Sequence, residues 1–209
     1  LHVFGRGACG EAEKGALRDA LAGRRIAPGP SGSPWRGRQD VLPTGRNLFA
    51  VDPRAVPTPS AHAQGIKLAE ELLRRHLQDH GDYPRRIVMD LWASPTLRSG
   101  GEDIAHALAL MGVEPLWDNA STRVTGFSIV PQPKLAFPRL DVPVRISGTF
   151  RDTLPGQIAL IDQAARAVAA LAEPDDWNDP AAARRRGTQG ARIFGAAPGR
   201  YGAAVADRA

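Results

Sequence analysis

Two acidic residues directly follow a pair of glycines in the stretch Gly100-Gly101-Glu102-Asp103, after an apolar segment. Glycine lets a ligand approach the backbone closely, and the amino end of a helix favours bound anions. In a purely structural interpretation, the two carboxylates only complement the helix dipole. The stretch is therefore a candidate ligand-binding turn, with the dipole role as the alternative.

Two histidines, His76 and His80, are four residues apart in a predicted helix, a spacing that can place both imidazoles on one metal ion. The residues between them lack the glutamate that marks a zinc protease. Their position beside Gly81, at the helix end, favours a solvated pair instead. The metal ligands stay unassigned, with these two histidines as the candidates.

Three glycines, Gly5, Gly7 and Gly10, fit the dinucleotide-binding pattern G-x-G-x-x-G after a predicted strand at 1–4. That pattern expects a second strand ending in an acidic residue about 20 residues later. The sequence has the basic stretch 23–28 there instead. A dinucleotide-dependent oxidoreductase is therefore one alternative function. The sequence contains no G-x-x-x-x-G-K-[ST], so ATP is not predicted to bind here through a P-loop.

The 209-residue chain has a net charge of +5, and most of its cations are arginine, which binds carboxylates and phosphates in a bidentate way. The arginines are dispersed and no nucleic-acid-binding motif is present, so nucleic acid is not a predicted partner. Charged residues in 139–141 and 147–152 stand at the ends of apolar strands, where α/β folds place their sites. Buried Arg–Asp pairing is the structural alternative for them.

The bulk composition is that of a globular protein, with 43% hydrophobic and 23% charged residues. A single cysteine, Cys9, allows no internal disulfide, which fits a reducing compartment. No apolar run approaches the ~20 residues that a membrane-spanning helix needs. The chain begins without Met, in what reads as a strand, and we expect it to be a piece of a longer protein.

Hydrophobic periodicity predicts an α/β fold. The predicted helices cover 11–21, 61–80, 100–111 and 157–171, and the predicted strands cover 86–92, 113–117, 124–130 and 142–147. The strand–helix–strand unit over 86–117 indicates a right-handed crossover within a parallel sheet. Prolines beside the last two strands favour sheet edges or loops for them.

The stretch 23–60 is rich in Gly and Pro and has no periodicity, but its apolar residues favour an ordered, packed loop. An Ala/Arg-rich linker is predicted over 181–190, followed by a Gly-rich motif at 192–202. We therefore predict a mostly parallel sheet flanked by helices, with a long Gly/Pro-rich ordered loop. One α/β domain would cover 1–178, and 179–209 would be a linker and the start of a following segment.

Five stretches together resemble the C-terminal part of the large subunit of aerobic ATP-dependent cobaltochelatase, a family that is similar to the magnesium chelatase large subunit. They are GPSGSPWRGRQDVLPTGRN (29–47), DPRAVPT (52–58), DLWASPTLRSGGEDIAHALALMGVEPLWD (90–118), PRLDVPVRISGTFRDTLPGQIALIDQAARAVAALAEP (138–174) and RIFGAAPGRYG (192–202). The motifs PTGRN, SGGED and SGTFRD carry most of the likeness. The forms GPSGSP and RIFGAAPGRYG favour the cobalt branch over the magnesium branch.

The resemblance implies a cytoplasmic subunit that binds a tetrapyrrole and a metal ion, and inserts Co(II) into hydrogenobyrinic acid a,c-diamide in cobalamin biosynthesis. ATP and Mg(II) would be used through a separate AAA+ ATPase subunit and its companion subunit. Such large subunits are several times longer than this chain, so we expect a C-terminal fragment that is inactive alone. The main catalytic residues would then lie upstream.

Metal insertion requires a divalent ion to lose water, inner N–H protons to be removed, and the macrocycle to be held. Carboxylates suit the first two tasks, so Glu102 and Asp103 are candidate catalytic residues. Arginines suit the third task, because the corrin periphery carries carboxylates. The candidate substrate-binding residues are Arg36, Arg38, Arg46 and Arg151. The alternatives are a magnesium chelatase large subunit, and a scaffold or ATPase-docking region without substrate contact.

Overall fold

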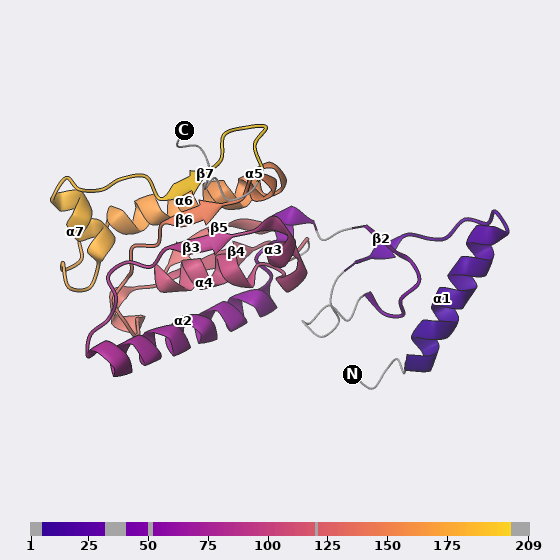
Figure 1. Cartoon of the computed structure of the whole chain (residues 1–209). Coiled ribbons are helices and arrows are strands. Elements are labelled where there is room, and N and C mark those ends of the chain that lie inside the picture. Colours follow the sequence, from indigo (N-terminus) through magenta and orange to yellow (C-terminus); the bar gives the residue numbers. More distant parts are fainter. Residues whose placement is uncertain (1–5, 32–40, 50–51, 120, 202–209) are drawn as a thin grey trace. The chain divides into compact units, whose positions relative to one another are not determined.

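The computed structural model describes residues 6–31, 41–49, 52–119 and 121–201. The chain forms two compact units, Leu1–Asp52 and Pro53–Ala209 (Figure 1). None of the described helices is long and apolar enough to cross a membrane.

The first unit contains helix α1 (Arg6–Leu21) and two short parallel strands, β1 (Gly29–Pro30) and β2 (Asn47–Phe49). The Asn47 amide ties the strands together, because its Nδ2 donates to the carbonyl oxygens of Pro30 at 2.6 Å and Val41 at 3.2 Å. Val41 is buried. The described parts of the Gly/Pro-rich region thus include buried positions at Gly29 and Val41, whereas most of 23–28 is exposed, and the order of the region as a whole stays a prediction.

Two closely packed helices, α2 (Pro59–His80) and α4 (Glu102–Leu110), form one side of the second unit. The side chain of Thr58 caps α2 by accepting from Ala61 N at 3.2 Å, and Gly81 ends it at φ 77°. Gly65 lies against α4, where an added Cβ would stand only 2.6 Å from the Ala105 carbonyl carbon. The helices approach this closely because α2 presents small residues to α4.

The second unit is built around a three-stranded parallel sheet in the order β3 (Met89–Leu91), β6 (Val144–Ile146) and β7 (Ile193–Gly195) (Figure 1). The predicted parallel sheet is therefore confirmed. The prediction that prolines place the strand over 142–147 at an edge is wrong, because β6 is central. Pro143 precedes β6 and uses only its carbonyl, which accepts from Met89 N at 3.0 Å.

The strands β4 (Val113–Trp117) and β5 (Val124–Ile129) form a separate antiparallel hairpin. The predicted crossover, with 113–117 in the same parallel sheet as 86–92, is wrong. A turn explains the difference: Asp118 N donates to the Arg123 carbonyl at 2.8 Å, and the Asp118 carboxylate accepts from Ser121 N at 2.7 Å. This turn folds β5 directly back onto β4.

Further helices lie where sequence periodicity gave little signal. They are α3 (Ala93–Ser99), α5 (Gly148–Thr153) and α7 (Asp179–Arg185). The remaining helix, α6 (Pro155–Ala169), was predicted, and two short 3-10 helices, η3 (Pro53–Ala55) and η4 (Gln132–Lys134), complete the described helical elements. Helix α7 stands where a linker was predicted. Asn178 caps it by accepting from Ala181 N at 2.9 Å, and its alanines 181–183 are buried, which is why this segment packs.

Arg139 is a fully buried cation that joins three parts of the second unit. Its guanidinium pairs with both carboxylate oxygens of Glu173, at 2.7 and 2.9 Å. The remaining donors reach the carbonyl oxygens of Met111, Gly112 and Val130, which end α4 and border the hairpin. Burying this charge is tolerable only because its donors are used.

We expect Arg139→Met to lower the free energy of unfolding by about 3–5 kcal/mol, because it removes the cation that pairs with Glu173 and the guanidinium donors to three carbonyl groups. Arg166→Met is the matched control: Arg166 is largely exposed and pairs with Asp162 at 2.9 Å, so a loss of less than about 1 kcal/mol is expected. Urea denaturation of the two variants measures both values, and equal losses would contradict the role given to Arg139.

We also expect Gly65→Ala to destabilise the second unit, although alanine is the better helix former, because the new methyl group collides with α4. Gly156→Ala in α6 is the control, since an added Cβ there meets nothing within 4 Å. The thermal unfolding midpoint should fall for the first variant and stay level or rise for the second. A midpoint for Gly65→Ala at or above the parent value would rule out the tight helix contact.

Candidate functional site

The carboxyl ends of β3, β6 and β7 lie at one edge of the sheet because the three strands are parallel. Segments following these strands therefore meet there, and this is where α/β folds place their sites. Trp92 continues β3 and Ser147 continues β6, with Ser147 N donating to the Leu91 carbonyl at 3.1 Å. Ser147 also caps α5 by accepting from Phe150 N at 3.2 Å. Three of the recognised motifs thus share one edge.

Arg151 in α5 holds the segment that follows β7. Its Nη1 donates to the carbonyl oxygens of Ala196 at 2.6 Å and Ala197 at 2.7 Å, and its Nε donates to Asp152 at 2.8 Å. The Arg151 guanidinium holds the pKa of Asp152 below its ordinary value. The partners of Arg151 are therefore groups of its own chain.

The same segment passes directly over Gly148, the first residue of α5. An added Cβ on Gly148 would collide with the carbonyl oxygen of Arg200 and stand 3.0 Å from the Tyr201 Cα. Only glycine allows this approach. Gly148 and Arg151 together fix residues 196–201 against the sheet edge.

The glycine pair before α4 is approached by its own chain. Gly101 has φ 91°, and an added Cβ would lie 2.5 Å from Val56 Cγ1 and 2.9 Å from Pro57 Cα. The carbonyl of Gly100 accepts from Thr58 N at 2.9 Å. The expected close approach to this turn therefore exists, but the segment that makes it is 56–58.

Asp103 connects α4 to α3 at the sheet edge. Its Oδ1 accepts from Ile104 N at 2.9 Å, and its Oδ2 accepts from the Thr96 hydroxyl. Burial raises the pKa of Asp103 above its ordinary value. Its neighbour Glu102 is half-buried, with its N–H donating to the Ser99 hydroxyl at 3.2 Å. Thr96 gave no sequence signal, because it stands seven residues before the carboxylate that it meets.

Two of the four candidate arginines fall on described residues, one in each unit. Arg36 and Arg38 lie outside the described residues. Arg46 is an exposed residue of the first unit, where its carbonyl accepts from Gly29 N at 2.6 Å. Arg151 belongs to the second unit. Their common role in substrate binding stays a prediction.

His76 and His80 lie side by side at the end of α2, with ring centroids 4.4 Å apart. The Nδ1 of His76 is 3.0 Å from the Asp82 carbonyl oxygen, which occupies one ring nitrogen. Within the described ranges, no group of three or more His, Cys, Asp or Glu side chains is placed to hold a metal ion. A metal-binding role for the pair stays a prediction.

Gly7 and Gly10 lie inside helix α1, whereas Gly5 is outside the described residues. A dinucleotide-binding turn uses its third glycine for close helix–strand packing. An added Cβ on Gly7 or Gly10 meets nothing within 4 Å. This geometry speaks against the dinucleotide-dependent oxidoreductase.

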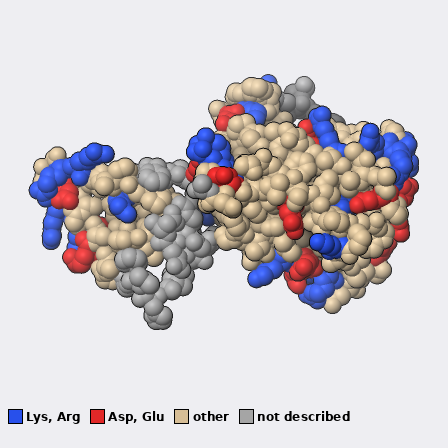
Figure 2. Space-filling model, turned by 180° about the vertical axis from the view of Figure 1, so that it is seen from behind, with Lys and Arg blue, Asp and Glu red and all other residues tan. Residues whose placement is uncertain are grey.

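The charged residues of 139–141 take part in buried ion pairs, which was the structural alternative to a role in a site. Besides Arg139, the buried Asp141 pairs with Arg86 at 2.7 Å and with the Nε of Arg192. On the face of the second unit seen in Figure 2, basic and acidic side chains are interspersed around a broad uncharged area.

Comparison with known proteins adds a family match over almost the whole chain. The family model described as CobN/Magnesium Chelatase matches residues 5–208. The chain is 52% identical, over 94% of its length, to the aerobic cobaltochelatase subunit CobN of Sinorhizobium sp, of which it spans 16%. It is 49% identical, over 95% of its length, to the CobN of Pseudomonas aeruginosa, of which it spans 17%.

Magnesium-chelatase subunits and solved structures are also similar to the chain. A magnesium-chelatase subunit of Rhodobacter capsulatus is 42% identical over 74% of the chain and 12% of its own length. The catalytic subunit of cobaltochelatase from Mycobacterium tuberculosis superimposes with a TM-score of 0.79 at 44% identity, covering 94% of this chain and 18% of that one. The chain thus corresponds to a small part of each of these proteins.

The buried carboxyl of Asp103 predicts a pH-dependent stability. Folding raises the pKa of Asp103, so the folded state holds this proton more tightly than the unfolded chain does. The free energy of unfolding therefore falls as the pH rises from the ordinary pKa to the raised pKa, and it stays lower above that pH. Asp103→Asn keeps the acceptor for Ile104 N and removes the charge. We expect its free energy of unfolding to exceed that of the parent at pH 7, with the difference shrinking towards about pH 4.

Urea denaturation at several pH values measures this difference. Asp79→Asn, at an exposed position of α2, serves as the control and should show no comparable gain at pH 7. A loss of stability in Asp103→Asn of more than about 1 kcal/mol at pH 7 would contradict the assigned environment.

Proposed function

Because the chain belongs to the CobN/magnesium chelatase family, we propose that it forms part of the tetrapyrrole- and metal-binding subunit of an ATP-dependent cobaltochelatase. The reaction would insert Co(II) into hydrogenobyrinic acid a,c-diamide. The identity of 52% to a CobN over 94% of the chain carries this proposal, against 42% over 74% for the magnesium-chelatase subunit of Rhodobacter capsulatus. Magnesium chelatase is the second candidate, supported by the same family model.

The chemistry of insertion sets the tasks of the subunit. Co(II) must exchange its bound water for the nitrogens of the macrocycle, and the inner N–H groups must give up their protons. The macrocycle must be held so that its nitrogens face the incoming ion. These tasks call for oxygen ligands, a proton acceptor and groups that bind peripheral carboxylates.

Glu102 and Asp103 are proposed to handle the metal ion or the protons. They stand at the amino end of α4, beside α3, which follows β3 at the sheet edge. The raised pKa of Asp103 makes its carboxylate a stronger base than that of an ordinary aspartate, which favours a role as proton acceptor. Its contacts with Thr96 and Ile104 hold the carboxylate in one orientation.

Arginines are proposed to bind the carboxylates of the corrin periphery. Arg46 is an exposed residue of the first unit, and Arg36 and Arg38 lie outside the described residues. Arg151 would contribute mainly by holding residues 196–201, since its donors reach Ala196, Ala197 and Asp152.

A scaffold role, without direct substrate contact, is the third candidate for this part of the subunit. The turn at Gly100 and Gly101 favours it, because residues 56–58 of the chain itself occupy the space that these glycines open. In that case the same residues would place a site formed elsewhere in the subunit, or would dock the ATPase.

ATP and Mg(II) are proposed to act through a partner AAA+ ATPase subunit and its companion, since the sequence has no P-loop motif. The assembly would work in the cytoplasm. The lone Cys9 agrees with a reducing compartment.

The test uses the full-length subunit with its ATPase partners, and compares Glu102→Gln with Glu70→Gln on the exposed side of α2. We expect Glu102→Gln to lower the cobalt insertion rate by roughly 10²-fold, because an amide neither accepts a proton nor binds a cation well. Quenching of protein fluorescence by hydrogenobyrinic acid a,c-diamide should show unchanged tetrapyrrole binding in both variants.

The two readouts separate the parts of the proposal. Equal insertion rates in the two variants would remove the catalytic role of Glu102 and leave the scaffold role. If the parent subunit failed to bind the corrin precursor but bound a porphyrin and inserted magnesium, the cobalt assignment itself would be wrong.

A further inference from the structure

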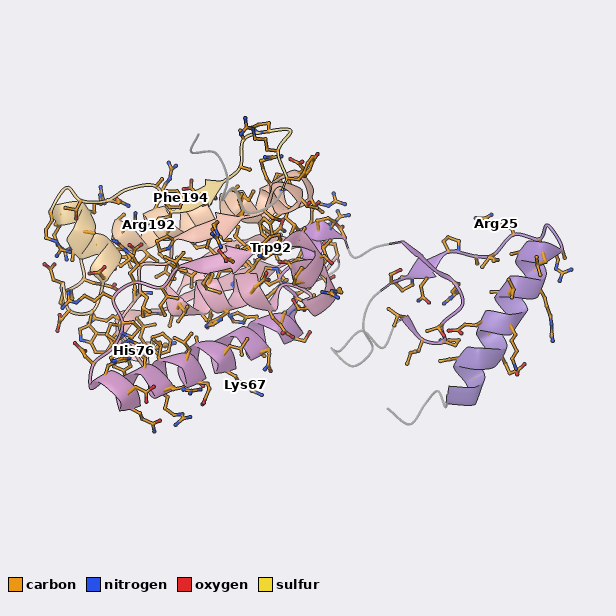
Figure 3. The ribbon with its side chains drawn as sticks, in the orientation of Figure 1. Arg25, Lys67, His76, Trp92, Arg192 and Phe194 are labelled. Atoms are coloured by element: carbon orange, nitrogen blue, oxygen red, sulfur yellow. The ribbon has the colours of Figure 1, made fainter. Side chains whose placement is uncertain are left out.

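The parallel sheet β3-β6-β7 is covered on one face and exposed on the other. Leu91, Val144 and Ile146 point into the core and are at most 5% exposed. The alternate positions are exposed: Val88 is 67%, Trp92 is 43% and Phe194 is 52% exposed. Figure 3 labels Trp92 and Phe194 along this sheet. The strands therefore present a second face that the described residues leave open.

An ion pair lies in the middle of this open face. Asp90, Arg145 and Phe194 stand in register across the three strands. The guanidinium of Arg145 donates to both carboxylate oxygens of Asp90, at 2.7 and 2.5 Å. Because the two charges satisfy each other, apolar atoms can cover the pair without leaving an unpaired charge. We call Val88, Asp90, Trp92, Arg145 and Phe194 the outer sheet face.

The composition of the outer sheet face is that of an interface. Aromatic residues and arginine are enriched in the buried centres of protein interfaces. All-parallel sheets occur almost only in proteins in which other elements cover both faces of the sheet. Exposed apolar side chains gathered on one face mark a place of contact. The sheet therefore requires a second layer.

We propose that an apolar segment of the same subunit, lying outside this chain, packs on the outer sheet face. The chain spans 16% and 17% of the two CobN relatives and 18% of the Mycobacterium tuberculosis subunit, so most of such a subunit is available to supply the layer. This inference rests on membership of the family and is independent of which metal is inserted.

A second copy of the chain fits this face less well. At the amino end of the sheet, Arg86 and Arg192 share the single carboxylate of Asp141, which leaves an excess positive charge. In a two-fold arrangement in which the amino ends of the two sheets meet, these excess charges would repel each other. For a segment of the same polypeptide this restriction does not apply, and its attachment lowers the entropic cost of contact.

Hydroxyl-radical footprinting of the full-length subunit tests the proposal without any substitution. The labelling rates of Trp92 and Phe194 are measured by mass spectrometry and compared with those of the same residues in the urea-unfolded subunit. We expect labelling in the folded subunit to be slower by far more than the roughly twofold reduction that half-exposed side chains would show. This readout does not depend on chelatase activity.

Each other outcome overturns the proposal. Labelling at about half the unfolded rate means that the face is open. Protection that appears only at dimer-forming concentrations assigns the face to a second copy, and protection that needs the ATPase subunits assigns it to them. Equal protection in the 209-residue chain by itself places the cover within this chain.

Discussion

The alignment of the parallel sheet depends on one buried carboxylate. Asp141 is 1% exposed and precedes β6, and its two oxygens pair with Arg86 ahead of β3 and Arg192 ahead of β7. A buried carboxylate without cations would be strongly destabilising. Both arginines must therefore reach Asp141, and this requirement fixes the three strands in one register. Since the amino ends are fixed in this way, the carboxyl ends of the strands are fixed too. The motifs that follow them therefore meet at one edge.

That edge is built from contacts between residues far apart in the sequence. Arg151 reaches the carbonyl groups of 196–197, and Asp103 reaches back to Thr96 in the preceding helix. Gln157 donates to the carbonyls of Pro53 and Val56, which holds the segment that packs on the glycine turn. The candidate site is thus a junction in which each conspicuous motif supports another. Such a junction can serve catalysis or scaffolding, and this is why the proposed rate measurement decides between them.

Sequence reasoning succeeded where one element carries its own signal. Helix α2 has an apolar stripe, a threonine cap and a terminal glycine, and its predicted ends at 61 and 80 lie close to those observed. Which strands pair was harder to predict. The alternation in 113–117 indicates a strand but not its partner, and the turn at Asp118 and Ser121 makes β5 that partner. Helix α7 was missed because alanine and arginine give no amphipathic period. Nor could local sequence show that the donors of Arg151 are used by carbonyl groups 45 and 46 residues later.

The placement of β7 has a consequence for the order in which the sheet is completed during synthesis. Strands β3 and β6 are both present once residue 146 has been made, but the third strand follows only at residues 193–195. Until then, β6, central in the finished sheet, is an edge strand with unpaired backbone groups, and Asp141 has Arg86 but not Arg192 as a partner. An open edge of this kind is where a growing chain is most exposed to wrong strand pairing. The last motif of the chain therefore closes the sheet as well as contributing to its carboxyl edge.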